Sequence, residues 1–144
     1  MIQMFKRMFG FEKKDIHEVE RKTILTVEDN DVDIRLIKSI LEKKYNVITA
    51  ENGEVGLEMI RKHKPDLVVL DCEMPVMTGN EMCKIMKNDN DLKEIPVLFL
   101  TSINTPKNII ECFELDAENH LSKPINSNVL LGQVDAILLG YETT

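Results

Sequence analysis

The feature of the sequence that most limits its fold is an alternation between short apolar runs and segments with helical spacing. Five runs are rich in β-branched and apolar residues, at positions 23–27, 46–49, 66–70, 95–100 and 119–121. In a parallel sheet covered on both faces, strands are continuous apolar runs of this kind. The runs therefore predict five buried parallel strands.

Each run is followed by a segment in which apolar residues recur at helical intervals. Ile34, Ile37 and Leu41, for example, fall on one side of a helix at 31–44. Strands and helices that alternate in this way predict an α/β fold, a doubly wound five-stranded parallel sheet with helices on both faces. The other four segments with helical spacing lie at 53–62, 79–87, 106–115 and 126–139.

Length and charge indicate one domain behind a short leader. The chain has 144 residues, which is the usual size of a single domain. Residues 1–22 carry a net charge of +2, whereas the rest of the chain carries −9. We therefore expect a leader at 1–22, a domain at 23–140 and a tail at 141–144. Such a tail leaves no room for a DNA-binding or catalytic output domain.

Composition argues against several classes of protein. The net charge of −7 disfavours a nucleic-acid partner. The three cysteines are too few and too scattered for a disulfide framework, and they form no C-x-x-C pair. No apolar run approaches the roughly 20 residues that a membrane-spanning helix needs. We expect a cytoplasmic protein that binds no nucleic acid.

The leader has an amphipathic pattern of its own. Ile2, Phe5, Met8 and Phe9 fall on one face of a helix, next to basic residues. Such a segment could pack on the domain, dimerise, dock a partner or remain a disordered tail. Contact with a membrane surface ranks behind self-packing and partner docking, because so short a segment anchors weakly.

Polar and charged residues gather where the predicted strands end. Glu28 and Asp29 follow the first strand, Asp71 follows the third, Thr101 the fourth and Lys123 the fifth. The carboxyl ends of parallel strands meet at one edge of the sheet, where ligands bind. Three carboxylates there repel one another unless a cation neutralises them, and oxygen ligands suit Mg²⁺. A carboxylate between a divalent cation and an ammonium is well placed to receive a phosphoryl group.

A simpler reading exists for each acid alone. Acidic residues after a strand often cap the following helix or are solvated in a loop, and we expect Asp31 to have one of these roles. Taken together, however, polar residues at four strand ends in this order favour a functional site.

Four motifs in these regions resemble the receiver domains of two-component response regulators. The resemblance covers about residues 22–139 and implies a flavodoxin-like (βα)5 fold with strand order 2-1-3-4-5. The motifs are ILTVEDN (24–30), VVLDCEMPVMTG (68–79), VLFLTS (97–102) and LSKPI (121–125).

The resemblance assigns a role to each acidic residue. It makes Asp71 the phosphoacceptor, which takes its phosphoryl group from a sensor histidine kinase. It makes Asp29 a direct ligand of Mg²⁺ and Glu28 a ligand through water. The main-chain carbonyl of Glu73 supplies a further metal ligand.

The resemblance also assigns the switch. Thr101 matches the hydroxyl that moves to the phosphoryl oxygen, and Lys123 matches the lysine that pairs with phosphate. Pro124 matches a proline whose peptide bond is cis in this family. His120 stands where the family usually has a tyrosine or phenylalanine that turns inward on activation. A histidine there could make the switch sensitive to pH, or it could be a partly exposed ring without such a role.

The resulting expectation is a regulatory phosphoacceptor domain and not an enzyme. Phosphorylation would change the face formed by the fourth helix, fifth strand and fifth helix, about 106–139, and thereby control binding of a downstream protein. An alternative is a phosphorelay intermediate that passes phosphate from Asp71 to a histidine phosphotransfer protein. A hydrolase of the haloacid-dehalogenase type is disfavoured, because that family carries Asp-x-Asp after its first strand, whereas the phosphoacceptor motif here follows the third. A receiver that acts only as a scaffold is disfavoured because no pocket residue is missing.

Overall fold

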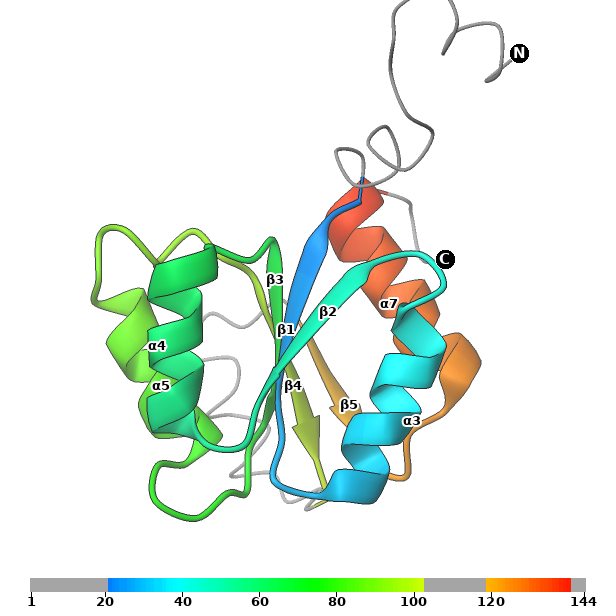
Figure 1. Cartoon of the computed structure of the whole chain (residues 1–144), viewed down its shortest axis with the longest axis horizontal. Helices are drawn as coiled ribbons and strands as arrows, with labels where there is room; N and C mark the ends of the chain where they lie inside the picture. The colour runs from blue at the N-terminus through cyan, green and yellow to red at the C-terminus, as the bar shows by residue number, and fades with distance from the viewer. Residues whose placement is uncertain (1–20, 103–118, 141–144) are drawn as a thin grey trace, which may run out of the picture.

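The computed structural model describes residues 21–102 and 119–140, which form one parallel sheet covered by helices on both faces (Figure 1). The strand order is β2-β1-β3-β4-β5, as predicted. The strands are β1 (Thr23–Val27), β2 (Asn46–Ala50), β3 (Leu67–Asp71), β4 (Val97–Thr101) and β5 (Asn119–Ser122). The described helices are α3 (Asp31–Leu41), α4 (Gly53–His63), α5 (Gly79–Lys87) and α7 (Ser127–Leu139).

The sheet separates two hydrophobic cores. Helices α4 and α5 cover one face and α3 and α7 cover the other (Figure 1). Successive strand residues point to opposite faces, so that Val68 and Leu70 pack toward α4 and α5 while Leu67 and Val69 pack toward α3 and α7. All four side chains are fully buried. The two cores pack against both faces of β1, β3 and β4, and these strands carry most of the polar residues of the sheet edge.

Polar caps fix the point at which each described helix begins. The side chain of Asn30 accepts a hydrogen bond from the Asp33 amide, and Asn52, Thr78 and Asn126 cap α4, α5 and α7 in the same way. Asp31, expected to cap α3 or to be solvated in a loop, has neither place, because Asn30 is the cap and Asp31 is the exposed first residue of the helix.

Element boundaries differ from the predictions by a few residues. The helix expected at 31–44 ends at Leu41, and the chain then turns so that Tyr45 is buried against α3 and α7. The predicted leader, tail and helix at 106–115 lie outside the described residues. Within the described part of the chain, no helix is long and apolar enough to cross a membrane.

Candidate functional site

The carboxyl ends of the strands bring the predicted site residues to one edge of the sheet. Asp71 and Thr101 are the last residues of β3 and β4, and their side chains are almost fully buried. Glu28 follows β1 directly, and its amide extends the pairing with β2 by donating to the Ala50 carbonyl at 3.0 Å. Lys123 follows β5. The parallel register therefore produces the predicted cluster.

Three carboxylates of this cluster are close enough to share a cation. Glu28, Asp29 and Asp71 each offer an oxygen, and these atoms lie within 4.8 Å of one another. Glu28 and Asp71 are buried and Asp29 is exposed, so one side of the group is open to solvent. Hard oxygen ligands with three negative charges fit Mg²⁺, which retains several waters when proteins bind it.

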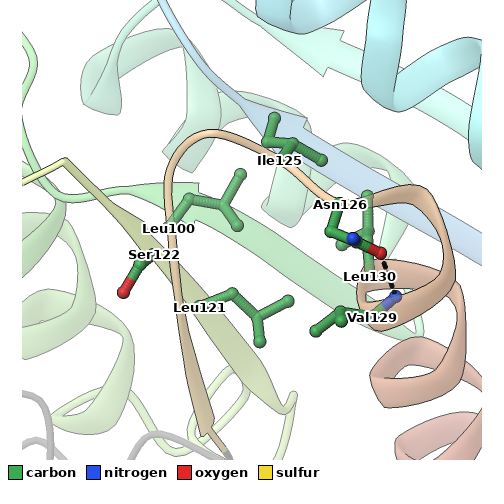
Figure 2. Close-up of a pocket in the computed structure, with 7 residues that line it drawn as sticks. All are labelled: Leu100, Leu121, Ser122, Ile125, Asn126, Val129 and Leu130. Atoms are coloured by element: carbon green, nitrogen blue, oxygen red, sulfur yellow. Dashed lines mark hydrogen bonds between the residues drawn. The ribbon is translucent and has the colours of Figure 1, made fainter.

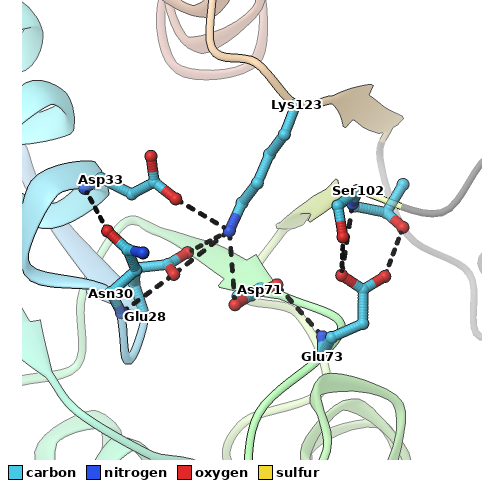
Figure 3. A network of polar contacts seen from close by, with 8 residues as sticks. Glu28, Asn30, Asp33, Asp71, Glu73, Ser102 and Lys123 are labelled. Carbon is cyan, nitrogen blue, oxygen red and sulfur yellow. Dashed lines mark hydrogen bonds and ion pairs between the residues drawn. The ribbon is translucent and has the colours of Figure 1, made fainter.

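Lys123 lies in the middle of the buried charges (Figure 3). Its ammonium nitrogen is 3.0 and 3.2 Å from the two oxygens of Glu28, and 3.5 Å from Asp71 Oδ2. It also lies 3.1 Å from Asp33 Oδ2, an ion pair that our sequence analysis did not anticipate. Asp33 belongs to the first turn of α3, and Asn30, the cap of that helix, donates its amide to Glu28. The sequence does carry a signal for Asp33: it stands three residues after Asn30, the helix cap that follows strand β1, and so lies in the first turn of α3 near the strand end.

Burial sets the protonation of these groups. It raises the pKa of Glu28 to about 7, and the charge of Asp71 adds to this effect. Burial also raises the pKa of Asp71, although the Glu73 amide and Lys123 oppose the rise. Burial alone would lower the pKa of Lys123, but its hydrogen bond to Glu28 and the charge of Asp71 raise it above its ordinary value. A divalent cation would favour ionisation of both buried carboxyls.

A second polar group lies beside the first and joins the ends of β3 and β4. The Glu73 carboxylate accepts hydrogen bonds from the Thr101 hydroxyl at 2.8 Å, the Ser102 amide at 3.3 Å and the Ser102 hydroxyl (Figure 3). Burial alone would raise the pKa of Glu73, but these hydrogen bonds outweigh it and lower the pKa. Sequence analysis missed both the role of Ser102 and the contact of Glu73 with Thr101.

The chain after β3 approaches Asp71 closely. A Cβ atom on Gly79 would lie 2.3 Å from the carbonyl oxygen of Asp71, so this position requires glycine. The Gly79 amide donates to the Cys72 carbonyl at 3.2 Å, and the Glu73 amide donates to Asp71 Oδ1 at 3.1 Å. The Glu73 amide thus holds the Asp71 carboxylate, while Gly79 packs against the Asp71 main chain.

The remaining predicted residues have simpler surroundings. The Lys123–Pro124 peptide bond is cis, as the resemblance implied. His120 is half-buried on β5, opposite Phe99 of β4. Its movement on activation, and metal binding by the carbonyl of Glu73, stay predictions.

An apolar cavity of about 250 Å³ lies between strands β4 and β5 and the start of α7 (Figure 2). Its lining includes Leu100 of β4, Leu121 of β5, Ile125 of the loop after β5 and Val129 of α7. None of the acidic residues or Lys123 lines it, so the cavity is distinct from the charged site.

Comparison with protein families gives a match over residues 24–135 to the response regulator receiver domain. The chain belongs to this family. Receiver domains are the regulatory phosphoacceptors of two-component signalling, they interact with histidine kinases, and they bind Mg²⁺ at an acidic cluster.

Individual relatives agree with this assignment. The chain is 32% identical over 106 residues to the polar-differentiation response regulator DivK of Brucella anthropi, covering 73% of this chain and 86% of that protein. The solved chemotaxis protein CheY4 of Vibrio cholerae has a TM-score of 0.77 at 30% identity, with 82% of this chain and 99% of that chain covered.

Other relatives are much longer proteins. The chain is 39% identical over 111 residues to histidine kinase P4 of Formosa agariphila, which covers 77% of this chain. It spans 8% of the length of that kinase, and 8% of the hybrid signal transduction histidine kinase D of Dictyostelium discoideum.

Proposed function

We propose that Asp71 accepts a phosphoryl group from a phosphohistidine of a sensor histidine kinase, in the presence of Mg²⁺. One observation carries this proposal. The Asp71 carboxylate is 2% exposed, lies 3.5 Å from the Lys123 ammonium, and has oxygens of Glu28 and Asp29 within 4.8 Å of one of its own. A nucleophilic oxygen thereby has a fixed positive charge and a site suited to a divalent cation as its neighbours.

The transfer itself needs little covalent help from the protein. A carboxylate oxygen of Asp71 forms a bond to phosphorus as the phosphorus–nitrogen bond of the phosphohistidine breaks, and the electron pair of that bond leaves with the imidazole. Lys123 can stabilise the negative charge on the equatorial oxygens, and the Thr101 hydroxyl can donate to one of them. Glu28, Asp29 and Asp71, with the carbonyl of Glu73, would hold Mg²⁺, which supplies further positive charge when bound.

The output of the proposed switch is protein binding. We infer that a shift of Thr101 and His120 after phosphorylation changes the face around 106–139, of which β5 and α7 lie within the described residues. A downstream protein that binds the phosphorylated form better would then be recruited by a shift in populations. We also propose that the domain extends from residue 23 to residue 140, and that the protein is located in the cytoplasm.

Intact mass measurement tests the phosphoacceptor. The protein is treated with a small phosphodonor and Mg²⁺, and we expect a gain of one phosphoryl group in the parent. We expect no gain for Asp71→Asn and an unchanged gain for Asp91→Asn, which alters an exposed aspartate in the loop after α5. If the parent shows no gain, a titration with beryllofluoride distinguishes rapid hydrolysis from a site that does not take phosphate. Failure of both experiments would contradict the proposal.

The likeness to segments of two histidine kinases favours a second candidate, a phosphorelay intermediate. In that case the phosphoryl group passes from Asp71 to a histidine phosphotransfer protein. Adding such a protein to the purified phosphorylated form would discharge Asp71 within seconds and label the added histidine. A phosphoryl group that stays on Asp71 in its presence would count against the relay.

A further inference from the structure

The Glu73 carboxylate and the proposed phosphoryl group compete for the same donor. Thr101 donates its hydroxyl hydrogen to Glu73 Oε1 at 2.8 Å, and it does so from an almost fully buried position at the end of β4. A hydroxyl has one hydrogen to donate. When Thr101 donates to Glu73, it therefore cannot donate to an oxygen on phosphorylated Asp71.

Glu73 also holds the residue that follows Thr101. Both the amide and the hydroxyl of Ser102 donate to Glu73 Oε2. The main-chain amide of Glu73 donates a hydrogen bond to Asp71 Oδ1 at 3.1 Å. One residue thus contacts the acceptor aspartate with its main chain and holds the end of β4 with its side chain (Figure 3).

Charge acts against the hydrogen bonds from Thr101 and Ser102 to Glu73 once Asp71 is phosphorylated. A phosphoryl group adds about two negative charges and three strong acceptor oxygens. These oxygens would compete for the Thr101 hydroxyl and would repel the nearby Glu73 carboxylate. These hydrogen bonds to Glu73 are therefore stable in the unphosphorylated protein and destabilised in the phosphorylated one.

We propose that Glu73 is a positioning residue that latches Thr101 and Ser102 in the unphosphorylated arrangement, so that phosphorylation must open this latch. The inference rests on the proposed function of Asp71. Release of Thr101 from Glu73 then opposes the binding of a phosphoryl group or its mimic. The latch is therefore predicted to lower the apparent affinity for such a group.

Beryllofluoride with Mg²⁺ is the probe, because it mimics a phosphoryl group on a carboxylate. Its affinity is measured by NMR titration for the parent, Asp71→Asn and Glu73→Ala, and the spectra also report whether each variant is folded. We expect Glu73→Ala to bind about fivefold more tightly, which corresponds to the net contribution of roughly one hydrogen bond. Binding that is equal for the parent and Asp71→Asn would contradict the proposed function itself.

A double-mutant cycle separates the latch from a simple effect of charge. In a Thr101→Val background there is no hydroxyl to release, so Glu73→Ala should increase the affinity clearly less. In a Thr101→Ser background, which keeps a hydroxyl, the full increase should return. An equal increase in all three backgrounds, or no increase in a parent that binds beryllofluoride through Asp71, would overturn the latch and leave the proposed function intact.

Discussion

Two polar groups share one edge of the sheet but are held together by different forces. The buried charge cluster, which we define as Glu28, Asp33, Asp71 and Lys123, places one ammonium among three carboxylates. The Glu73 bridge, which we define as Glu73, Thr101 and Ser102, places one half-buried carboxylate among uncharged donors.

The difference in forces implies a difference in cost. Breaking a buried ion pair leaves an uncompensated charge. Removing one of several uncharged donors leaves the half-buried Glu73 carboxylate with its other donors and with solvent, so it costs less. The cluster is therefore suited to fix the reacting groups, and the bridge is suited to move.

Removing the central charge should destabilise the protein most. We expect Lys123→Met to lower the free energy of unfolding by about 3 kcal/mol in the absence of divalent cations, because Glu28 and Asp71 lose their buried partner. Urea denaturation at about pH 8 measures this. The matched control is Lys38→Met, which removes an exposed pair with Glu42 and should cost at most about 0.5 kcal/mol. Equal losses in the two variants would contradict a special role for the cluster.

A close approach in the loop after β3 should affect both polar groups together. In Gly79→Ala the new methyl group would collide with the Asp71 carbonyl. We expect the free energy of unfolding, measured by urea denaturation, to fall by about 2 kcal/mol. Gly132→Ala is the control, because a Cβ there meets nothing within 4 Å. In the interior of α7 it should stabilise the protein by up to about 1 kcal/mol. If Gly79→Ala were as stable as the parent, the described packing against Asp71 would be wrong.

The protonation of Glu28 should be visible in the pH dependence of stability. Its pKa rises from 4.5 to about 7 on folding, so the folded protein binds more protons than the unfolded chain between these values. The free energy of unfolding without divalent cations should therefore fall as pH rises through this interval. Thermal melts in a chelator measure the slope, which should be shallower in Glu28→Gln. An unchanged slope in that variant would show that Glu28 is not the group that titrates.

The smallest effect is expected in the bridge. Ser102→Ala should lower the free energy of unfolding by no more than about 0.5 kcal/mol, because the Ser102 amide and the Thr101 hydroxyl still donate to Glu73. Urea denaturation with the exposed Ser127→Ala as a control tests this expectation. A loss comparable to that of Lys123→Met would make the bridge as rigid as the charge cluster, contrary to the division drawn here.

The strand ends could be predicted because burial alone specifies them. Runs of buried residues such as those of β3 and β4 have no other stable place than the inside of a covered sheet, and a parallel sheet brings their ends to one edge. Asp71, Thr101 and Lys123 follow from that geometry. The order of the strands came instead from the motifs shared with receiver domains, because the alternation of elements leaves several orders open.

The contacts of Glu73 and Asp33 could not be predicted in this way. Each depends on the direction of one side chain that extends from a loop or from the first turn of a helix. Spacing along the sequence places Glu73 two residues after Asp71, but it does not say that the carboxylate turns toward Thr101. Asn30 was likewise not identified as the cap of α3, since both Asn30 and Asp31 are able to accept a hydrogen bond at a helix start.

Chemical mapping of the modified residue shows whether Asp71 is the phosphoacceptor. After treatment with a small phosphodonor and Mg²⁺, borohydride reduces an acyl phosphate to an alcohol, and peptide mass spectrometry locates the reduced residue. Our prediction is reduction at Asp71 alone, and none when a chelator replaces Mg²⁺. Reduction at another carboxylate, or at Asp71 independently of Mg²⁺, would contradict it.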